Sequence, residues 1–200
     1  MNIKKIVCFG DSTTAKRIVN GKKLEVYPHI LESALAHKNL PTLVINAGVS
    51  GSNTRTAMER LKSDVCDHDP FLVVIQFGIN DSWVDNDIEN ASSRIPLEEY
   101  SKNINKMISR INSMGARLIL MTPNPIGNIY EKWRFERLKV YAEKVKEIAY
   151  ENDIELIDIW KIFMEYKFID ELLLDSMHPN EKGHELTGQA LIKTVIKVIK

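Results

Sequence analysis

The chain has 200 residues, and its 27 basic and 27 acidic side chains give a formal net charge of zero. The ordinary composition, 44% hydrophobic and 27% charged, excludes collagen-like, low-complexity and disordered chains. The length predicts a single domain over residues 1–200. The balanced charge argues against nucleic acid or an anionic membrane as a partner, and no apolar run approaches the roughly 20 residues that span a bilayer.

Short apolar runs, separated by amphipathic segments, predict the strands of a sheet. The run over residues 71–77 is almost continuously apolar, which is typical of a parallel strand covered on both faces. The alternation of strands with helical segments predicts an α/β fold, an open parallel sheet with helices on both faces. The expected strands cover residues 3–9, 42–46, 71–77, 117–121 and 154–157.

Four amphipathic stripes predict helices between and after these strands. Two less regular stretches, residues 82–96 and 122–132, are expected to be long loops after the third and fourth strands. In sheets of this kind, ligands bind outside the carboxyl ends of the strands, so any chemistry is expected just after each strand. The apolar stripes lie at residues 27–35, 97–111, 138–149 and 186–199.

The basic N-terminus resembles the start of a signal peptide, but the apolar stretch that follows, residues 6–9, is too short for one. We therefore expect a cytoplasmic protein. Cys8 and Cys66 form neither a CxxC pair nor a set of zinc ligands, so both are expected to be free thiols. No HExxH spacing occurs, and neither a metal nor an organic cofactor is expected.

Polar residues and glycines follow the first three predicted strands. Ser12 comes directly after the first strand, where a strand-to-helix corner can present its hydroxyl to a cleft. Gly48 and Gly51 follow the second strand and can bring backbone N–H groups close to a ligand. Asn80 follows the third strand and offers an amide donor. Each of these residues, taken alone, is also typical of an ordinary turn or helix cap.

An Asp and a His stand close together near the C-terminus. Pro179 disfavours helical geometry at His178, so the imidazole is expected in a loop just before the last helix. Asp175 lies three residues earlier and can orient one ring nitrogen. A solvent-exposed Asp beside a capping His explains the segment equally well. His184 falls within the last helical stripe and is expected to support this loop rather than to react.

Together these residues supply a nucleophile, an oriented base and an oxyanion hole, which are the needs of acyl transfer. The sequence resembles the SGNH hydrolase superfamily, also called GDSL-type esterases and lipases. Four blocks carry the resemblance in the order of the family, and the resemblance extends over nearly the whole chain. They are Gly10-Asp11-Ser12, residues 46–51, Gly78-Ile79-Asn80-Asp81 and residues 175–179.

The resemblance implies a three-layer α/β/α sandwich with a five-stranded parallel sheet in the flavodoxin-like order 2-1-3-4-5. It also implies a catalytic triad of Ser12 as nucleophile, His178 as base and Asp175 as its orienting carboxylate. The oxyanion hole would consist of the Ser12 N–H, the Gly51 N–H and the Asn80 side-chain amide. Gly51 is preferred to Gly48 only on the alignment of the Ser-Gly pair.

The expected function is hydrolysis of a carboxylic ester through an acyl-enzyme on Ser12. The expected substrate is a small molecule with a short acyl group. Thr13 stands where many family members have Leu or Ile, and Gly-Asp-Ser-Thr also occurs among sugar-ester deacetylases of the superfamily. A thioesterase, a lysophospholipase or an acyltransferase would use the same residues. A flavodoxin-like nucleotide-binding module could use residues 12–14 to cradle a phosphate, but it leaves Asn80 and His178 without a role.

Three residues are expected to bind the substrate: Asp11, Trp83 and Trp133. The two tryptophans belong to loops that follow strand ends, so they are expected at the rim of the site. Aromatic faces among carboxylates suit a sugar-like alcohol carrying an acetyl group better than a long-chain lipid. The alternative is that both rings merely pack their loops onto the core. The other polar and aromatic residues of these loops are Asp81, Asp85, Asp87, Glu89 and Tyr130.

Overall fold

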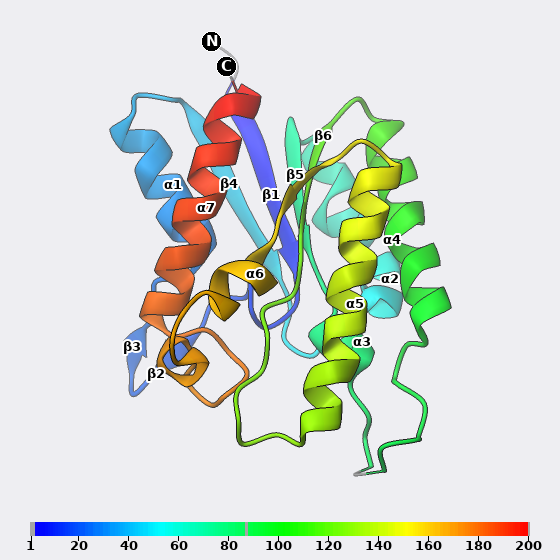
Figure 1. Ribbon diagram of the computed structural model, residues 1–200. Coiled ribbons are helices and arrows are strands. Elements are labelled where there is room, and N and C mark those ends of the chain that lie inside the picture. The colour runs from blue at the N-terminus through cyan, green and yellow to red at the C-terminus, as the bar shows by residue number, and fades with distance from the viewer. Residues whose placement is uncertain (1–2, 87, 200) are drawn as a thin grey trace.

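The computed structural model describes residues 3–86 and 88–199 (Figure 1). Its centre is a parallel five-stranded sheet with the order β4-β1-β5-β6-β7. Numbered along the chain, this is the order 2-1-3-4-5, so the predicted fold class and strand order are confirmed. The strands are β1 (Lys4–Gly10), β4 (Thr42–Gly48), β5 (Leu72–Gln76), β6 (Arg117–Met121) and β7 (Glu155–Ile157).

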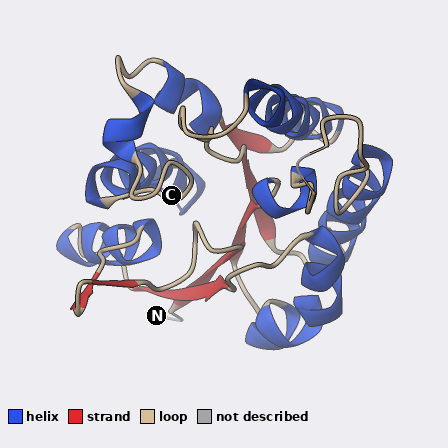
Figure 2. Ribbon diagram, turned by 90° about the horizontal axis from the view of Figure 1, so that it is seen from below, coloured by secondary structure: helices blue, strands red, loops and turns tan. Residues whose placement is uncertain are grey.

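Helices cover both faces of this sheet, as Figure 2 shows along the strands. Alternate residues of a strand point to opposite faces, so Ile6 and Cys8 of β1 pack into one core while Val7 and Phe9 pack into the other. The first core is closed by α1 (Tyr27–His37), α6 (Ile159–Met164) and α7 (Glu181–Ile199). The second is closed by α2 (Thr54–Asp64), α4 (Leu97–Asn112) and α5 (Lys132–Glu151).

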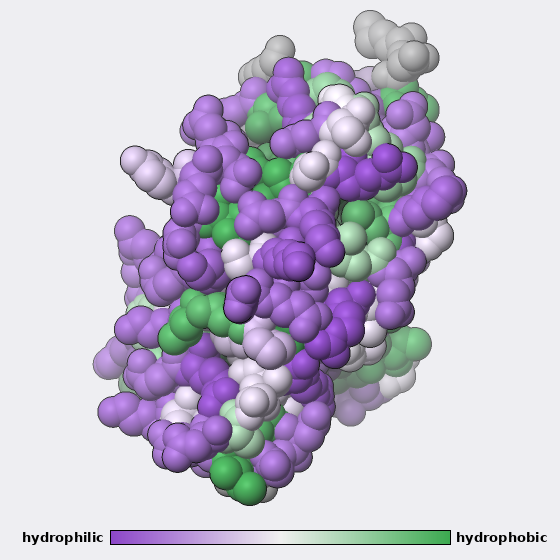
Figure 3. All heavy atoms as spheres, turned by 90° about the vertical axis from the view of Figure 1, so that its right-hand side faces the viewer, coloured by the Kyte–Doolittle hydropathy of each residue, from purple (hydrophilic) through white to green (hydrophobic). Residues whose placement is uncertain are grey.

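The outward sides of these helices are polar. α4 buries one stripe and turns the rest of its surface to solvent, in keeping with its predicted amphipathic pattern. The face of the molecule in Figure 3 is largely hydrophilic, with small separate apolar patches. Among the described residues, no helix is both long enough and apolar enough to cross a membrane. The buried residues of α4 are Tyr100, Asn103, Ile104, Met107, Ile108 and Ile111.

Several features differ from the sequence-based expectation, and α2 and α6 match none of the four predicted stripes. A hairpin of β2 (Ile18–Val19) and β3 (Lys22–Lys23) follows the first strand, and its turn residues Asn20 and Gly21 both have positive φ. Its strands are too short to give an apolar pattern. A single helical turn, α3 (Ile79–Ser82), follows β5 directly, so the Asn80 segment is helical rather than an open turn.

The carboxyl ends of the central strands lie at one level. Gly10 pairs with Gly48 of β4 and with Gln76 of β5, and Gln76 pairs with Met121 of β6. The segments that follow these strands therefore emerge side by side, at the lower edge of the sheet in Figure 1. This register brings the polar segments after β1, β4 and β5 together.

His184 of α7 is buried and lies beside α1. The backbone N–H of Tyr27 points at its Nδ1 over 3.4 Å, and the side chain is almost fully covered. Burial lowers the pKa of His184 from 6.5 to about 3, and the nearby Arg17 adds to this effect. The ring is therefore neutral in the folded protein, which suits a supporting role.

We expect the free energy of unfolding to fall as the pH is lowered from about 7 to about 5, because His184 takes up a proton in the unfolded chain but resists it in the fold. His184→Gln should weaken this dependence, whereas His37→Gln, at an exposed position, should retain it. Urea unfolding at both pH values measures it. An unchanged pH dependence in His184→Gln would contradict this interpretation.

Candidate active site

Three side chains from the two ends of the protein form a continuous series of hydrogen bonds. Ser12 follows β1, whereas Asp175 and His178 lie in the loop before α7. Ser12 Oγ is 2.9 Å from His178 Nε2. His178 Nδ1 is 2.8 Å from Asp175 Oδ2. With its proton on Nδ1, the ring turns the lone pair of Nε2 toward the serine hydroxyl, which is the geometry of a general base.

Asp175 hydrogen-bonds to the backbone of His178 as well as to its ring. Its Oδ1 accepts the His178 backbone N–H at 2.9 Å and the Met177 backbone N–H at 3.2 Å. Partial burial raises the pKa of the Asp175 carboxyl, but the hydrogen bonds from His178 outweigh this and hold the pKa below its usual value. The carboxylate is therefore ionised at neutral pH and can stabilise a protonated ring.

A network that the sequence did not reveal supports this loop. Ser176, between the two triad residues, has φ of +58°, a left-handed conformation that is strained for a non-glycine residue. Asp170 accepts hydrogen bonds from Ser176 Oγ at 2.8 Å and Asn128 Nδ2 at 2.9 Å. The Gly127 N–H donates to the Ser176 carbonyl at 2.6 Å. The loop after β6 thus holds the strained segment in place.

Two of the predicted oxyanion donors are backbone N–H groups that have no hydrogen-bond partner in the described part of the chain. Within the described residues, neither Ser12 N–H nor Gly51 N–H donates a hydrogen bond. The Gly48 N–H, by contrast, donates to Asn46 Oδ1 at 3.0 Å. A Cβ on Gly48 would lie 2.3 Å from the backbone nitrogen of Ala15, so Gly48 serves close packing. The choice of Gly51 over Gly48 is therefore favoured by the geometry.

Asn80 lies beside this pair on the single-turn helix α3. Its Nδ2 donates one hydrogen bond, to the Ser52 carbonyl at 3.0 Å. An amide nitrogen carries two hydrogens, so the second remains available to a substrate oxygen. Because Ser52 follows Gly51 directly, the same hydrogen bond holds the two predicted oxyanion donors together.

Asp11 does not have the exposure expected of a substrate-binding residue. Its side chain is buried, with only 1% of the residue exposed. Its Oδ1 accepts hydrogen bonds from the Thr13 backbone N–H and the Thr13 hydroxyl, both at 2.8 Å. Burial raises the pKa of the Asp11 carboxyl. The side chain shapes the turn that presents Ser12.

Trp83 and Trp133 each stack one ring face on the same arginine. The guanidinium carbon of Arg134 lies 4.4 Å from the centre of the Trp83 ring and 4.3 Å from that of Trp133. Tyr130 packs edge-on against Trp83, with 5.4 Å between ring centres. This favours the alternative that the tryptophans pack the loops. Asp87, expected among the acidic residues of the same loop, lies outside the described residues.

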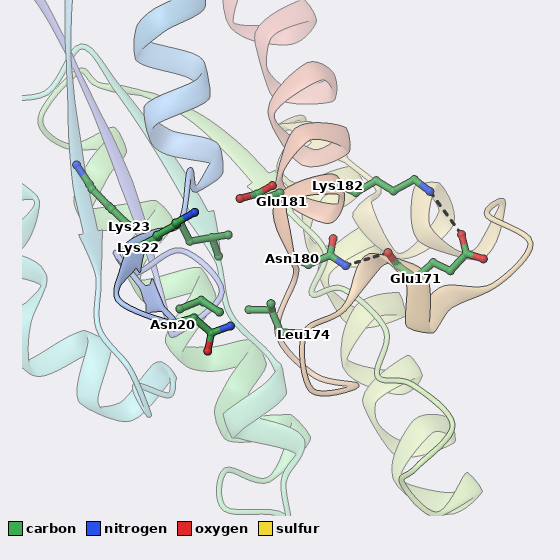
Figure 4. Close-up of a pocket in the computed structure, with 10 residues that line it drawn as sticks. Asn20, Lys22, Lys23, Glu171, Leu174, Asn180, Glu181 and Lys182 are labelled. Carbon is green, nitrogen blue, oxygen red and sulfur yellow. Dashed lines mark hydrogen bonds and ion pairs between the residues drawn. The ribbon is translucent and has the colours of Figure 1, made fainter.

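A groove of about 620 Å³ lies between the β2–β3 hairpin and the segment around the triad loop (Figure 4). Two of the residues that line this groove flank the triad loop in sequence. Leu174 precedes Asp175, and Asn180 follows His178 by two residues. Lys22 and Lys23 of the hairpin line the groove from its other side. In the part of the chain that the structure describes, no three His, Cys, Asp or Glu side chains cluster so as to hold a metal ion.

The family model of the GDSL-like Lipase/Acylhydrolase family matches residues 8–186. The chain therefore belongs to this family and is an ester-hydrolysing enzyme, and the resemblance to SGNH hydrolases is confirmed. This outcome favours a hydrolase over the nucleotide-binding alternative.

Individual relatives agree with this assignment. The chain is 32% identical over 161 residues to the human isoamyl acetate-hydrolyzing esterase 1 homolog, covering 71% of this chain but only 64% of that protein. It is 29% identical over 157 residues to an acetylxylan esterase from Geobacillus stearothermophilus, covering 76% and 71%. A solved lipase/acylhydrolase from Enterococcus faecalis superposes with a TM-score of 0.84 at 29% identity, over 96% of this chain and 95% of that one.

If Trp83 is a packing residue, Trp83→Ala should lower Tm more than it changes substrate affinity. Loss of the ring removes its contacts with Arg134 and Tyr130, and we expect Tm to fall by about 4–8 °C. KM for an acetyl ester should change by less than about twofold, because the ring is engaged by Arg134 and Tyr130 rather than by the substrate. A large rise in KM at unchanged Tm would restore Trp83 as a substrate-binding residue.

Proposed function

We propose that the protein hydrolyses small acetyl esters through an acyl-enzyme on Ser12. The observation that carries this proposal is the hydrogen-bonded chain from Ser12 Oγ through His178 to Asp175, at 2.9 and 2.8 Å, beside unoccupied backbone N–H groups. An oriented base next to a hydroxyl and a set of free donors are the parts that ester hydrolysis requires.

The first half of the reaction forms the acyl-enzyme. Ser12 Oγ attacks the carbonyl carbon of the ester while its proton passes to His178 Nε2, and Asp175 stabilises the resulting imidazolium. The carbonyl oxygen becomes an oxyanion, which the N–H groups of Ser12 and Gly51 and the amide of Asn80 stabilise. The C–O bond to the alcohol then breaks, and the imidazolium gives its proton to the leaving alkoxide.

The second half releases the acid. Water enters the place of the alcohol, and His178 Nε2 removes one of its protons as its oxygen attacks the acyl carbon. The same donors stabilise the second tetrahedral intermediate. When this intermediate collapses, the bond to Ser12 Oγ breaks and His178 returns the proton to the serine. The products are one carboxylic acid and one alcohol, with the enzyme restored.

The names of the relatives support acetate as the acyl group. An isoamyl acetate-hydrolyzing esterase homolog and an acetylxylan esterase share the acetyl group and differ in the alcohol, one alkyl and one a sugar polymer. In this chain, Arg134 covers one face of each rim tryptophan that could stack on a sugar. Val49, Ile129 and Leu174 are instead exposed apolar side chains in loops at this edge. These features support a small, partly apolar alcohol.

Ser12→Ala should remove ester hydrolysis by at least about 10³-fold in kcat, since the nucleophile is lost. Tm should change little, because Ser12 is half-buried and its hydroxyl bonds only to His178 among the described residues. Ser113→Ala, at an exposed serine at the end of α4, is the matched control and should retain full activity. A Ser12→Ala enzyme with more than a tenth of wild-type kcat, a threshold of about 1.4 kcal/mol, would refute the proposal.

The acyl preference should appear in kcat/KM across p-nitrophenyl esters of increasing chain length. We expect the highest value for acetyl or butyryl and a steep decline toward octanoyl and palmitoyl. Isoamyl acetate should also be hydrolysed faster than acetylated xylose, because Arg134 already covers one face of each rim tryptophan. A maximum at octanoyl or longer would instead place the protein with the lipases or thioesterases of the family.

A further inference from the structure

We propose that Asp81 is a positioning residue for the oxyanion hole, which it serves by fixing the end of the loop that carries Gly51. The proposal rests on the function proposed above, in which Gly51 and Asn80 donate hydrogen bonds to the oxyanion. Asp81 follows Asn80 on α3, and its side chain is fully buried and bonded to Thr54 of α2.

Two neighbouring side chains of α3 hold the loop after β4 at two successive points. Asn80 Nδ2 donates to the Ser52 carbonyl at 3.0 Å. Asp81 Oδ1 accepts the Thr54 backbone N–H at 2.8 Å and the Thr54 hydroxyl at 2.6 Å. Ser52 and Thr54 lie one and three residues after Gly51, so the backbone N–H of Gly51 is fixed relative to the Asn80 amide.

Thr54 is a firm anchor for this contact. It is the first residue of α2 and is itself fully buried. Its hydroxyl also accepts a hydrogen bond from Asn103 Nδ2 of α4 at 3.2 Å. The loop therefore ends at a point that is tied to both α3 and α4. Since Gly51 is exposed and has φ of +78°, its own segment supplies little restraint, and the anchor must come from residues such as these.

The burial of Asp81 is costly, which argues that the contact has a purpose beyond filling space. Its Oδ2 has no hydrogen-bond partner among the described residues. Burying a carboxylate oxygen without a partner is unfavourable. Burial raises the pKa of Asp81 to about 7, and the two hydrogen bonds from Thr54 oppose that rise. A protein retains such a group where strong acceptor bonds to an N–H and a hydroxyl are needed.

The test compares Asp81→Ala, which removes both hydrogen bonds, with Asp81→Asn, whose side-chain oxygen can still accept them. We expect kcat for p-nitrophenyl acetate to fall about 10–100-fold in Asp81→Ala with KM changed less than about threefold, since misplaced donors act on the transition state. Asp81→Asn should recover most of kcat. The affinity for a boronic acid, which forms a tetrahedral adduct on the serine, should fall in step with kcat/KM.

A matched control separates positioning from general loss of stability. Asp158 caps the N-terminus of α6 by accepting the Lys161 N–H at 3.0 Å, as Asp81 holds the start of α2. Asp158→Ala should lower Tm but keep kcat within about twofold. If Asp81→Ala fails to fold, Thr54→Val removes the hydroxyl donor from the other side, and a fall in kcat of about 3–10-fold at unchanged KM is then expected.

Asn80→Ala separates a failure of the positioning role of Asp81 from a failure of the oxyanion hole itself. If Asn80→Ala lowers kcat by about 10²–10³ while Asp81→Ala (or Thr54→Val) leaves kcat and boronic acid affinity unchanged, the positioning role is overturned and the oxyanion hole stands. If Asn80→Ala itself leaves kcat unchanged, the oxyanion hole fails and this inference with it. In the double variant, the two losses should be less than additive in free energy, because both act on the same donors.

Discussion

The register of β1 between β4 and β5 is the constraint on which the site depends. Gly10 pairs with Gly48 on one side and Gln76 on the other, so the segments with Ser12, Gly51 and Asn80 start from one level. Arg60 of α2 reinforces this arrangement, since its guanidinium donates to the carbonyls of Gly10 at 2.8 Å and Ala47 at 2.9 Å. A partly buried cation thus binds carbonyls at the carboxyl ends of two neighbouring strands.

The second half of the site comes from the far end of the chain and needs its own support. Asp175 and His178 sit on a loop with a strained Ser176, and strain of this kind persists only when the surroundings fix it. The side chain of Asp170 and the loop after β6 supply that support. The serine and its base are therefore positioned by separate parts of the fold, and the 2.9 Å contact between them depends on both.

Much of the fold and several candidate catalytic residues could be predicted from the sequence, because they follow local rules. Strand pattern and alternation indicated the sheet, the strand ends indicated Ser12 and Asn80, and the neighbouring Asp175 and Pro179 indicated His178. Other contacts depend on tertiary partners that no local pattern reveals. Trp83 was expected to face a substrate, but Arg134, about fifty residues away in sequence, covers its ring. The bond from Asp81 to Thr54 spans 27 residues and left no signal in the sequence.

The central claim is that His178 activates Ser12 as the nucleophile. The most direct measurement is reaction with a serine-directed phosphonate ester, followed by peptide mapping and by the rate of labelling in His178→Ala. The account predicts a covalent adduct on Ser12 alone and a labelling rate about 10³-fold lower without the imidazole. An adduct on another residue, or an unchanged rate in His178→Ala, would contradict it.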